Sequence, residues 1–161
     1  MLRADKPIVI DIFPQDMASG YWGDLTRTVV RGKASEKVKR MFAAVRAAHR
    51  AALKTVRAGR VISEVHQAAA VVLVGHGFQT GTEKGRPVGF IHSTGHGVGL
   101  AIHENPPVAA SVNQKLAVGH VITIEPGLYY PDAGGMRIED TVVVTAAGYR
   151  RLSACEIRLE I

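Results

Sequence analysis

The chain has 161 residues, of which 47% are hydrophobic and 21% are charged, and its formal net charge is +6 at pH 7. A chain of this length and composition typically folds as one globular domain, which we assign to residues 1–161. No apolar run reaches the roughly 18 residues of a membrane span, and the residues before Pro7 lack the apolar core of a signal peptide. We therefore predict no membrane partner. Cys155 is the only cysteine, which excludes an intramolecular disulfide and favours a cytoplasmic protein.

The positive charge is concentrated between Lys33 and Arg60. The lysines and arginines recur there at the spacing of a solvated helix face, and neither interleaved aromatic residues nor a zinc-finger spacing accompanies them. We therefore predict no nucleic-acid partner, and a basic nucleic-acid binder stays only as the third alternative for function.

Two strands joined by a turn are expected near the start of the chain. Residues 7–13 (PIVIDIF) are an apolar, β-branched run that predicts a buried strand, and residues 21–31 predict a second strand. The intervening PQDMASG is typical of a turn, so the two strands should form a hairpin.

Two helices should follow the hairpin. Ser35 is a suitable cap for a helix that ends near Ala58-Gly59. Its apolar positions recur at intervals of three and four residues, and they comprise Val38, Met41, Phe42, Val45, His49, Ala52, Leu53 and Val56. A second helix is predicted from about Ser63 to Val74, because Gly75-His76-Gly77 would stop it.

The remainder of the chain is rich in strand-forming residues. Residues 78–89 predict a polar loop, and strands are expected within 90–104, 121–130 and 135–145 and after Gly148. Strands, then two helices, then further strands indicate an α+β domain with the helices packed on one face of a mostly antiparallel sheet.

Asp11 and Asp24 are acids on the two arms of the predicted hairpin. Cross-strand partners in an antiparallel hairpin have a constant index sum, so Asp11 faces Asp24 if the turn is centred between Met17 and Ala18. Two opposed buried carboxylates are costly unless a cation lies between them. The alternatives are that one of the two caps the turn or pairs with Arg27.

Three histidines, His92, His96 and His103, lie in the glycine-rich stretch HSTGHGVGLAIH. Glycines on both sides of His96 let the backbone approach closely, as a crowded site requires. The odd spacing between His96 and His103 places them on opposite faces of a regular strand, so both point inward only if the stretch bends or bulges. Purely structural histidines are the alternative.

Glu125 and Glu139 are acids next to apolar strand residues. Glu125 follows the run VITI, and Pro126-Gly127 turns the chain directly after it. In the segment RIED, Arg137 and Glu139 are two residues apart and share a strand face, whereas Asp140 points the other way. This alternation favours Glu139 as the inward carboxylate, and a surface salt-bridge cluster is the alternative.

These acids and one histidine make a candidate ligand set, which comprises Asp11, Asp24, His96, Glu125 and Glu139. Four carboxylates and one imidazole suit divalent ions such as Mn²⁺, Co²⁺ or Zn²⁺. The set suggests a two-metal hydrolase.

Four stretches carry these ligands in chain order: IDIFPQDMASGYWGDLTRT, HSTGHGVGLAIHENP, ITIEPGLYY and GGMRIEDTVVVT. In this order they resemble the pita-bread-fold metallopeptidases, which include methionine aminopeptidase, aminopeptidase P and prolidase. The resemblance runs from Ile8 to Leu152, nearly the whole chain. It implies the pita-bread (creatinase/aminopeptidase) form of an α+β fold, with a mostly antiparallel curved sheet and helices on its outer face.

The resemblance also implies roles for the site residues. The five ligands would hold two divalent ions, Mn²⁺ or Co²⁺ in first place and Zn²⁺ or Fe²⁺ as alternatives, with Asp24 and Glu139 bridging them. The ions would generate a bridging hydroxide and polarise the scissile carbonyl. Glu125 would in addition shuttle a proton, and His92 and His103 would bind substrate and stabilise the tetrahedral intermediate.

Within the family, Arg137 and the short interval from Glu125 to Glu139 resemble the proline-specific branch. Arg137 would then join His92 and His103 in binding the substrate. The implied reaction is hydrolysis of an Xaa-Pro bond at the amino terminus of a short peptide that has proline at its second position. A methionine aminopeptidase is the alternative among enzymes.

Two departures from the family pattern bear on these expectations. The interval from Asp11 to Asp24 is longer by an even number of residues, which preserves side-chain parity, and Asp16 is a less favoured substitute ligand. Segments that precede this region in the family, among them a substrate-binding histidine, are absent before residues 1–6. We therefore expect a partial catalytic domain whose uncovered apolar surface and sheet edge favour a homo-oligomer. A non-catalytic fragment or binding module that keeps the metal ligands is the second hypothesis.

Overall fold

The predicted hairpin forms, but its register differs from the predicted one. The computed structural model describes residues 3–161, so the first two residues of the expected start lie outside it. β1 (Ile8–Ile12) pairs antiparallel with β2 (Leu25–Val29), and Asp11 lies opposite Thr26. The predicted pairing of Asp11 with Asp24 is therefore wrong by two residues, because the loop is centred between Ala18 and Ser19. An even shift keeps parity, so Asp24 stays on the face of Asp11.

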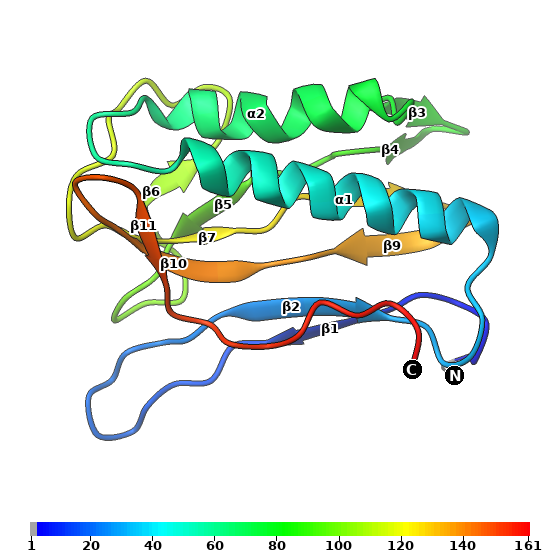
Figure 1. Cartoon of the computed structure of the whole chain (residues 1–161), viewed down its shortest axis with the longest axis horizontal. Coiled ribbons are helices and arrows are strands. Elements are labelled where there is room, and N and C mark those ends of the chain that lie inside the picture. The colour runs from blue at the N-terminus through cyan, green and yellow to red at the C-terminus, as the bar shows by residue number, and fades with distance from the viewer. Residues whose placement is uncertain (1–2) are drawn as a thin grey trace.

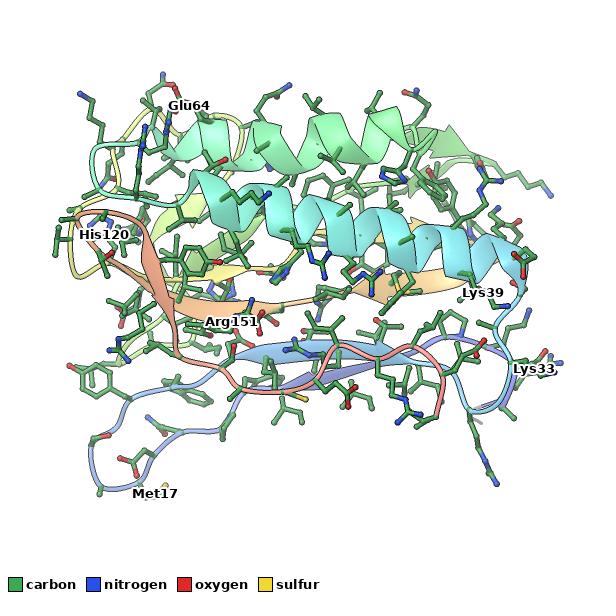
Figure 2. The ribbon with its side chains drawn as sticks, in the orientation of Figure 1. Met17, Lys33, Lys39, Glu64, His120 and Arg151 are labelled. Carbon is green, nitrogen blue, oxygen red and sulfur yellow. The ribbon has the colours of Figure 1, made fainter. Side chains whose placement is uncertain are left out.

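β1 is also less buried than predicted. Ile10 and Ile12, which point away from the face that carries Asp11, are 41% and 51% exposed. Among the described residues β1 pairs only with β2, so its second edge has no strand partner. Figure 1 shows this hairpin at the bottom of the molecule, and Met17 marks the far end of its loop in Figure 2.

The two helices form as predicted. α1 (Glu36–Thr55) begins at the cap Ser35, whose side chain accepts a hydrogen bond from the Val38 amide, and α2 (Ile62–Gly75) ends before His76. All eight residues of the predicted apolar stripe of α1 are buried. The helices pack on each other and lie above β1 and β2 in Figure 1. Within residues 3–161, neither helix is both long and apolar enough to cross a membrane.

The main sheet has five strands in the order β11-β10-β7-β5-β6, and every neighbouring pair is antiparallel. Its strands are β5 (Gly95–Gly97), β6 (Glu104–Val108), β7 (Val121–Ile124), β10 (Asp140–Val144) and β11 (Tyr149–Arg151). A separate hairpin joins β8 (Gly127–Tyr130) and β9 (Gly134–Arg137). The helices cover one side of these strands and the β1–β2 hairpin lies on the other (Figure 1). The predicted α+β class is confirmed.

Residues 78–89 are not the loop that we predicted. β3 (Gly81–Glu83) and β4 (Arg86–Val88) form a short hairpin there. Lys84 and Gly85 connect the strands, and both have positive φ, 49° and 77°. Two consecutive residues with positive φ make the tight turn whose twist matches a hairpin, and a lysine at the first position masks this signal in the sequence.

Candidate metal centre

A cleft of about 320 Å³ opens between the β1–β2 hairpin and the main sheet. Its lining comprises Asp11, Phe13, Asp24, His96, Ile102, His103, Glu125, Arg137 and Glu139. The cleft therefore contains all five predicted ligands together with His103 and Arg137. His92 is not part of the lining, and the substitute ligand Asp16 lies in the exposed hairpin loop, where its carboxylate binds Ser19.

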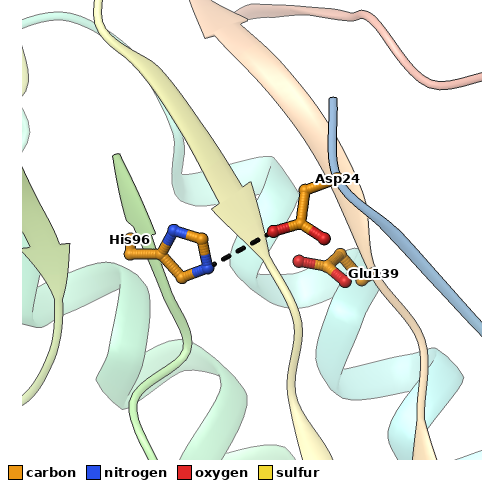
Figure 3. Close-up of side chains that lie close together, drawn as sticks. All are labelled: Asp24, His96 and Glu139. Carbon is orange, nitrogen blue, oxygen red and sulfur yellow. Dashed lines mark ion pairs between the residues drawn. The ribbon is translucent and has the colours of Figure 1, made fainter. Parts of the chain in front are cut away.

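Three of the five predicted ligands lie close to one another. Asp24, His96 and Glu139 each offer one ligand atom, and these atoms all lie within 4.8 Å of one another (Figure 3). Asp24 and Glu139 are buried, and His96 is half-buried. The three residues come from the position just before β2, from β5 and from the segment between β9 and β10, so only the folded chain brings them together.

The orientation of His96 fits a metal ligand. Its Nδ1 lies 3.0 Å from the carbonyl oxygen of Gly97, which can only accept, so Nδ1 carries a proton. Nε2 then points at the carboxylates of Asp24 and Glu125, at 3.5 and 3.3 Å. Nε2 is therefore the ring atom that can share a cation with these two carboxylates, and a backbone carbonyl on the second ring nitrogen is the usual partner of a metal-bound histidine.

The glycines around His96 are required by close strand contacts. A Cβ on Gly95 would collide with the backbone of Thr123 in β7, and one on Gly97 would lie 2.6 Å from the carbonyl oxygen of Asn105. The pairing of β5 with β6 shifts register between these two glycines. The chain bends over residues 98–103, between the antiparallel strands β5 and β6, and the rings of His96 and His103 meet with centroids 4.3 Å apart.

Thr26 links two of the carboxylates, and sequence reasoning missed it. Its hydroxyl lies 2.8 Å from Oδ1 of Asp11 and 2.6 Å from Oε2 of Glu139. It shares the parity of Asp24 on β2, so the inward face of that strand was the available signal. Thr123, also missed, lies 3.2 Å from Oε1 of Glu125 and accepts the amide of His96.

The cleft gathers more carboxyl groups than the cations of the chain can pair with. Burial raises the pKa of Glu125 to about 7 and that of Glu139 to about 8, and the neighbouring carboxylates add to both shifts. Burial likewise raises the pKa of Asp24, against the opposing effect of His96. Four carboxylates gathered with too little positive charge are the arrangement that bound cations stabilise.

Arg137 is the one permanent cation among the residues that line the cleft. Its Nη2 donates to Asp11 at 2.5 Å, its Nε lies 3.8 Å from Glu125, and its Nη1 donates to the hydroxyl of Tyr129 at 3.1 Å. The Tyr129 hydroxyl lies in turn 3.1 Å from Nε2 of His92. His92 thus reaches the cleft only through Tyr129 and Arg137, and Tyr129 is a second residue that the sequence did not single out.

Asp140 lies on the far side of its strand from the cleft. Its carboxylate is fully buried and accepts hydrogen bonds from Arg27 and Ser153, and it also lies near Arg151 and His49. Arg27 is thus the partner of Asp140, and the alternative in which it pairs with Asp11 or Asp24 is wrong.

The fold and the cleft together define a class: an α+β protein with a carboxylate-rich site suited to divalent metal ions. The profile of metallopeptidase family M24 matches residues 1–146. The chain therefore belongs to metallopeptidase family M24.

Individual relatives agree with this assignment. The chain is 38% identical to the Xaa-Pro dipeptidase of Pyrococcus furiosus over 94% of its own length and 41% of that protein. The dipeptidase PepE structure from Mycobacterium ulcerans superposes with a TM-score of 0.88 at 35% identity, over 99% of this chain and 42% of that one. The prolidase structure from Pyrococcus horikoshii gives a TM-score of 0.85 at 38% identity, over 94% and 41%. The fold is the expected pita-bread fold, and the chain spans about two fifths of each relative.

Proposed function

We propose that this chain carries a dinuclear metal centre that hydrolyses Xaa-Pro bonds at the amino terminus of short peptides. The proposal assigns residues 1–161 to one catalytic domain. The observation that carries it is the convergence of Asp11, Asp24, His96, Glu125 and Glu139 in one cleft. Four carboxylates and one imidazole with an excess of negative charge fit two divalent ions better than one.

The five residues would hold the ions in the arrangement expected from the resemblance, with Asp24 and Glu139 shared between them. When bound, the ions supply Lewis-acid polarisation of the scissile carbonyl and activation of water at neutral pH. Thr26 and Arg137 orient Asp11 and Glu139 by hydrogen bonds, so these carboxylates enter the reaction already positioned. Mn²⁺ or Co²⁺ is the proposed metal, since oxygen ligands predominate and one imidazole is present.

Glu125 is the proposed proton carrier. In the metal-free cleft burial raises its pKa to about 7, so this carboxyl group exchanges a proton near neutral pH before an ion binds. Thr123 and His96 hold its Oε1 side, and Arg137 lies on its Oε2 side. This environment lets Glu125 take a proton and return it to the leaving amine without leaving the cleft.

His103 and His92 are proposed to bind substrate. His103 is exposed at the edge of the cleft and contacts the ring of His96, so it can reach a peptide that enters from solvent. His92 lies behind Tyr129, and burial lowers its pKa, which keeps its ring neutral. A neutral His92 would act through the Tyr129 hydroxyl and Arg137.

The preference for proline rests on Arg137 and on the relatives. The Pyrococcus proteins named above carry the names Xaa-Pro dipeptidase and prolidase, at 38% identity to this chain. We propose the same substrate class for the site in this chain. A cytoplasmic location and a homo-oligomer belong to the proposal as well, the first supported by the single cysteine and the second by the exposed Ile10 and Ile12 on β1.

The test combines metal binding with two substrates. Calorimetric titration of the folded chain with Mn²⁺ should show saturable binding, and the loaded chain should release proline from an Xaa-Pro dipeptide but leave a methionyl peptide without proline intact. Cleavage of the methionyl peptide instead would favour a methionine aminopeptidase. Binding of Mn²⁺ without cleavage of either, together with activity in a version extended to the length of the relatives, would favour a metal-binding module. No binding of Mn²⁺ would refute the metal centre.

A further inference from the structure

Arg27 is the most completely hydrogen-bonded cation of the described residues, and the mechanism above does not use it. It lies in β2 next to Thr26, faces away from the cleft, and is only 7% exposed. A guanidinium has five N–H donors, and all five have acceptors here. The acceptors are the carbonyl oxygens of Thr26, Glu139, Cys155 and Glu156 and the carboxylate of Asp140.

Two of these acceptors, the carbonyl oxygens of Thr26 and Glu139, belong to the backbone around the predicted ligand Glu139. Glu139 lies between β9 and β10 and is part of neither strand. Its amide donates to the carbonyl oxygen of Thr26 at 3.0 Å, and its own carbonyl oxygen accepts from Nη1 of Arg27. The same Nη1 also donates to the Thr26 carbonyl oxygen at 2.9 Å. Arg27 therefore binds the Glu139 carbonyl oxygen directly and shares the Thr26 carbonyl oxygen with the Glu139 amide.

The other acceptors fix the guanidinium itself. Nη2 donates to Oδ1 of Asp140 at 2.8 Å, an atom that also accepts from the hydroxyl of Ser153 at 2.7 Å. Nη2 and Nε donate to the carbonyl oxygens of Cys155 and Glu156, at 2.7 and 3.2 Å. These carbonyls belong to the segment that follows β11, which has no ladder of its own at this point. The orientation of the guanidinium thus depends on Asp140 and on the carboxy-terminal segment.

We propose that Arg27 is a positioning residue for the metal ligand Glu139, and that it couples the carboxy-terminal segment around Cys155 and Glu156 to the metal centre. The inference rests on the proposed metal centre and deepens it. The Arg27 guanidinium joins the Glu139 carbonyl oxygen to the Cys155 and Glu156 carbonyl oxygens, which are all acceptors and cannot bind one another. An ordered segment at 155–156 holds Arg27, Arg27 holds the Glu139 peptide, and the carboxylate is thereby aimed at Asp24 and His96.

The geometry requires arginine and not merely a positive charge. A lysine at position 27 would keep the charge beside Asp140 but present three donors from one nitrogen atom. It could not reach the Thr26 and Glu139 carbonyls on one side and the Cys155 and Glu156 carbonyls on the other. Arg27→Lys is therefore the informative substitution, because it separates charge from geometry.

The experiment measures the metal centre directly. Arg27→Lys should lower Mn²⁺ affinity by roughly tenfold to a hundredfold, the range seen when a residue that orients a ligand is lost, and it should change the visible absorption of the Co²⁺-loaded protein. In the wild-type chain, metal binding should slow amide hydrogen exchange at residues 155–158, because coupling between two sites is reciprocal. That slowing should disappear in Arg27→Lys.

Controls separate positioning from stability. Val45→Ala removes buried volume from α1 without touching the cleft, so it should lower the melting temperature and leave the Mn²⁺ affinity and the Co²⁺ spectrum unchanged. If Arg27→Lys does not fold, Asp140→Asn decides the question: it keeps the Oδ1 acceptor, removes the charge, and should weaken Mn²⁺ binding in the same direction by less.

The outcomes distinguish this inference from the proposed function. Failure of the wild-type chain to bind Mn²⁺ would overturn the metal centre as a whole. Normal Mn²⁺ binding by the wild type, together with unchanged affinity, spectrum and exchange in whichever of the two variants folds, would overturn the role of Arg27 alone and make it a structural residue.

Discussion

Glu139 and Asp140 are neighbours in the chain and both are buried, yet their surroundings are opposite. Glu139 faces a cleft that gathers four carboxylates around one arginine, Arg137. Asp140 faces Arg27 at 2.8 Å, Arg151 at 3.2 Å and His49 at 3.4 Å, with no second carboxylate among these partners. One cluster is short of positive charge and the other has a surplus.

The difference separates two uses of a buried acid. Around Asp140 the chain supplies its own cations, so the carboxylate is part of the framework that joins β2, β10 and the carboxy-terminal segment. Around Glu139 the chain does not supply enough positive charge, and burial raises the pKa of the side chain to about 8. A buried acid that the protein leaves without a counter-charge is the stronger indication of a site for an external cation.

The largest expected effect comes from a substitution of Asp140, whose buried carboxylate is surrounded by Arg27, Arg151 and His49. Asp140→Leu would leave the buried Arg27 guanidinium without its counter-charge, and we expect a loss of about 3–5 kcal/mol in the free energy of unfolding. Urea denaturation of the metal-free protein measures it. Asp132→Leu is the matched control, since Asp132 also binds a cation, Lys37, but at the exposed surface; it should change stability little. Equal effects of the two substitutions would contradict the comparison.

Substitution of Glu139 should have the opposite result: a large loss of metal affinity and no loss of stability. Glu139→Gln should weaken Mn²⁺ binding by more than about a hundredfold, because it removes a ligand and not merely an outer partner. The metal-free variant should be at least as stable as the wild type at pH 8. The folded pKa of Glu139 lies above its unfolded value, so the wild type loses stability as pH rises from about 4.5 to about 8. The glutamine variant should lose less, because only Glu125 and Asp24, whose pKa values burial also raises, still contribute to the loss. Calorimetric titration measures the Mn²⁺ affinity, and thermal unfolding in chelator measures the stability of the metal-free protein.

The pH dependence of metal binding tests the same cluster in the wild type. Glu125 and Glu139 have pKa values of about 7 and about 8 in the metal-free protein, and both must lose their protons to bind an ion. Apparent Mn²⁺ affinity should therefore rise with pH up to about 8, by up to about tenfold per pH unit for each proton released. Titration in two buffers of different ionisation enthalpy counts the protons. An affinity that does not change between pH 6 and pH 8 would refute the raised pKa values.

The smallest expected effect concerns His49, on the compensated side. Burial lowers the pKa of His49 to about 4, and the nearby Arg151, Arg27 and Arg50 oppose its protonation while Asp140 favours it. A histidine whose folded pKa is below the unfolded value contributes stability that is complete above about pH 6.5 and is lost as pH falls towards 4. His49→Leu should remove part of this acid loss and change little at pH 7.5. Thermal unfolding in chelator at several pH values measures the difference, and parallel curves for variant and wild type would contradict it.

Local sequence patterns were sufficient for the elements whose side chains have a strong period. Every residue of the apolar stripe predicted for α1 is buried, and the stripe missed only the small Ala44 and Ala48, because a helix face depends on spacing within one segment. Strand alternation from Arg137 to Glu139 was sufficient to select Glu139 over Asp140 as the acid that lines the cleft, and the even interval of two residues kept Asp24 on the face of Asp11. The β3–β4 hairpin was missed because Lys84 occupies a position with positive φ where asparagine or glycine would have given the signal.

Local sequence patterns did not predict the strand register or which side chains contact one another. Asp11 lies opposite Thr26 because the geometry of the long hairpin loop moves the centre of the turn, and composition alone does not predict that centre. Thr26 and Tyr129 were not predicted as site residues, because a hydroxyl group on a strand carries no functional signal until its neighbours are known. His103 reaches His96 because the chain reverses over residues 98–103, between the antiparallel strands β5 and β6.

The sequence by itself therefore determined the chemistry of the ligands, their order and the faces on which they lie, because these depend on residue type and on short periods. Tertiary structure alone decided which acids receive a counter-charge from the chain. Arg137 pairs with Asp11 and Arg27 with Asp140 across more than a hundred residues, and such pairs are set by how strands pack and not by spacing. That choice leaves the cleft acids short of positive charge, and this shortage is the physical basis of the proposed metal centre.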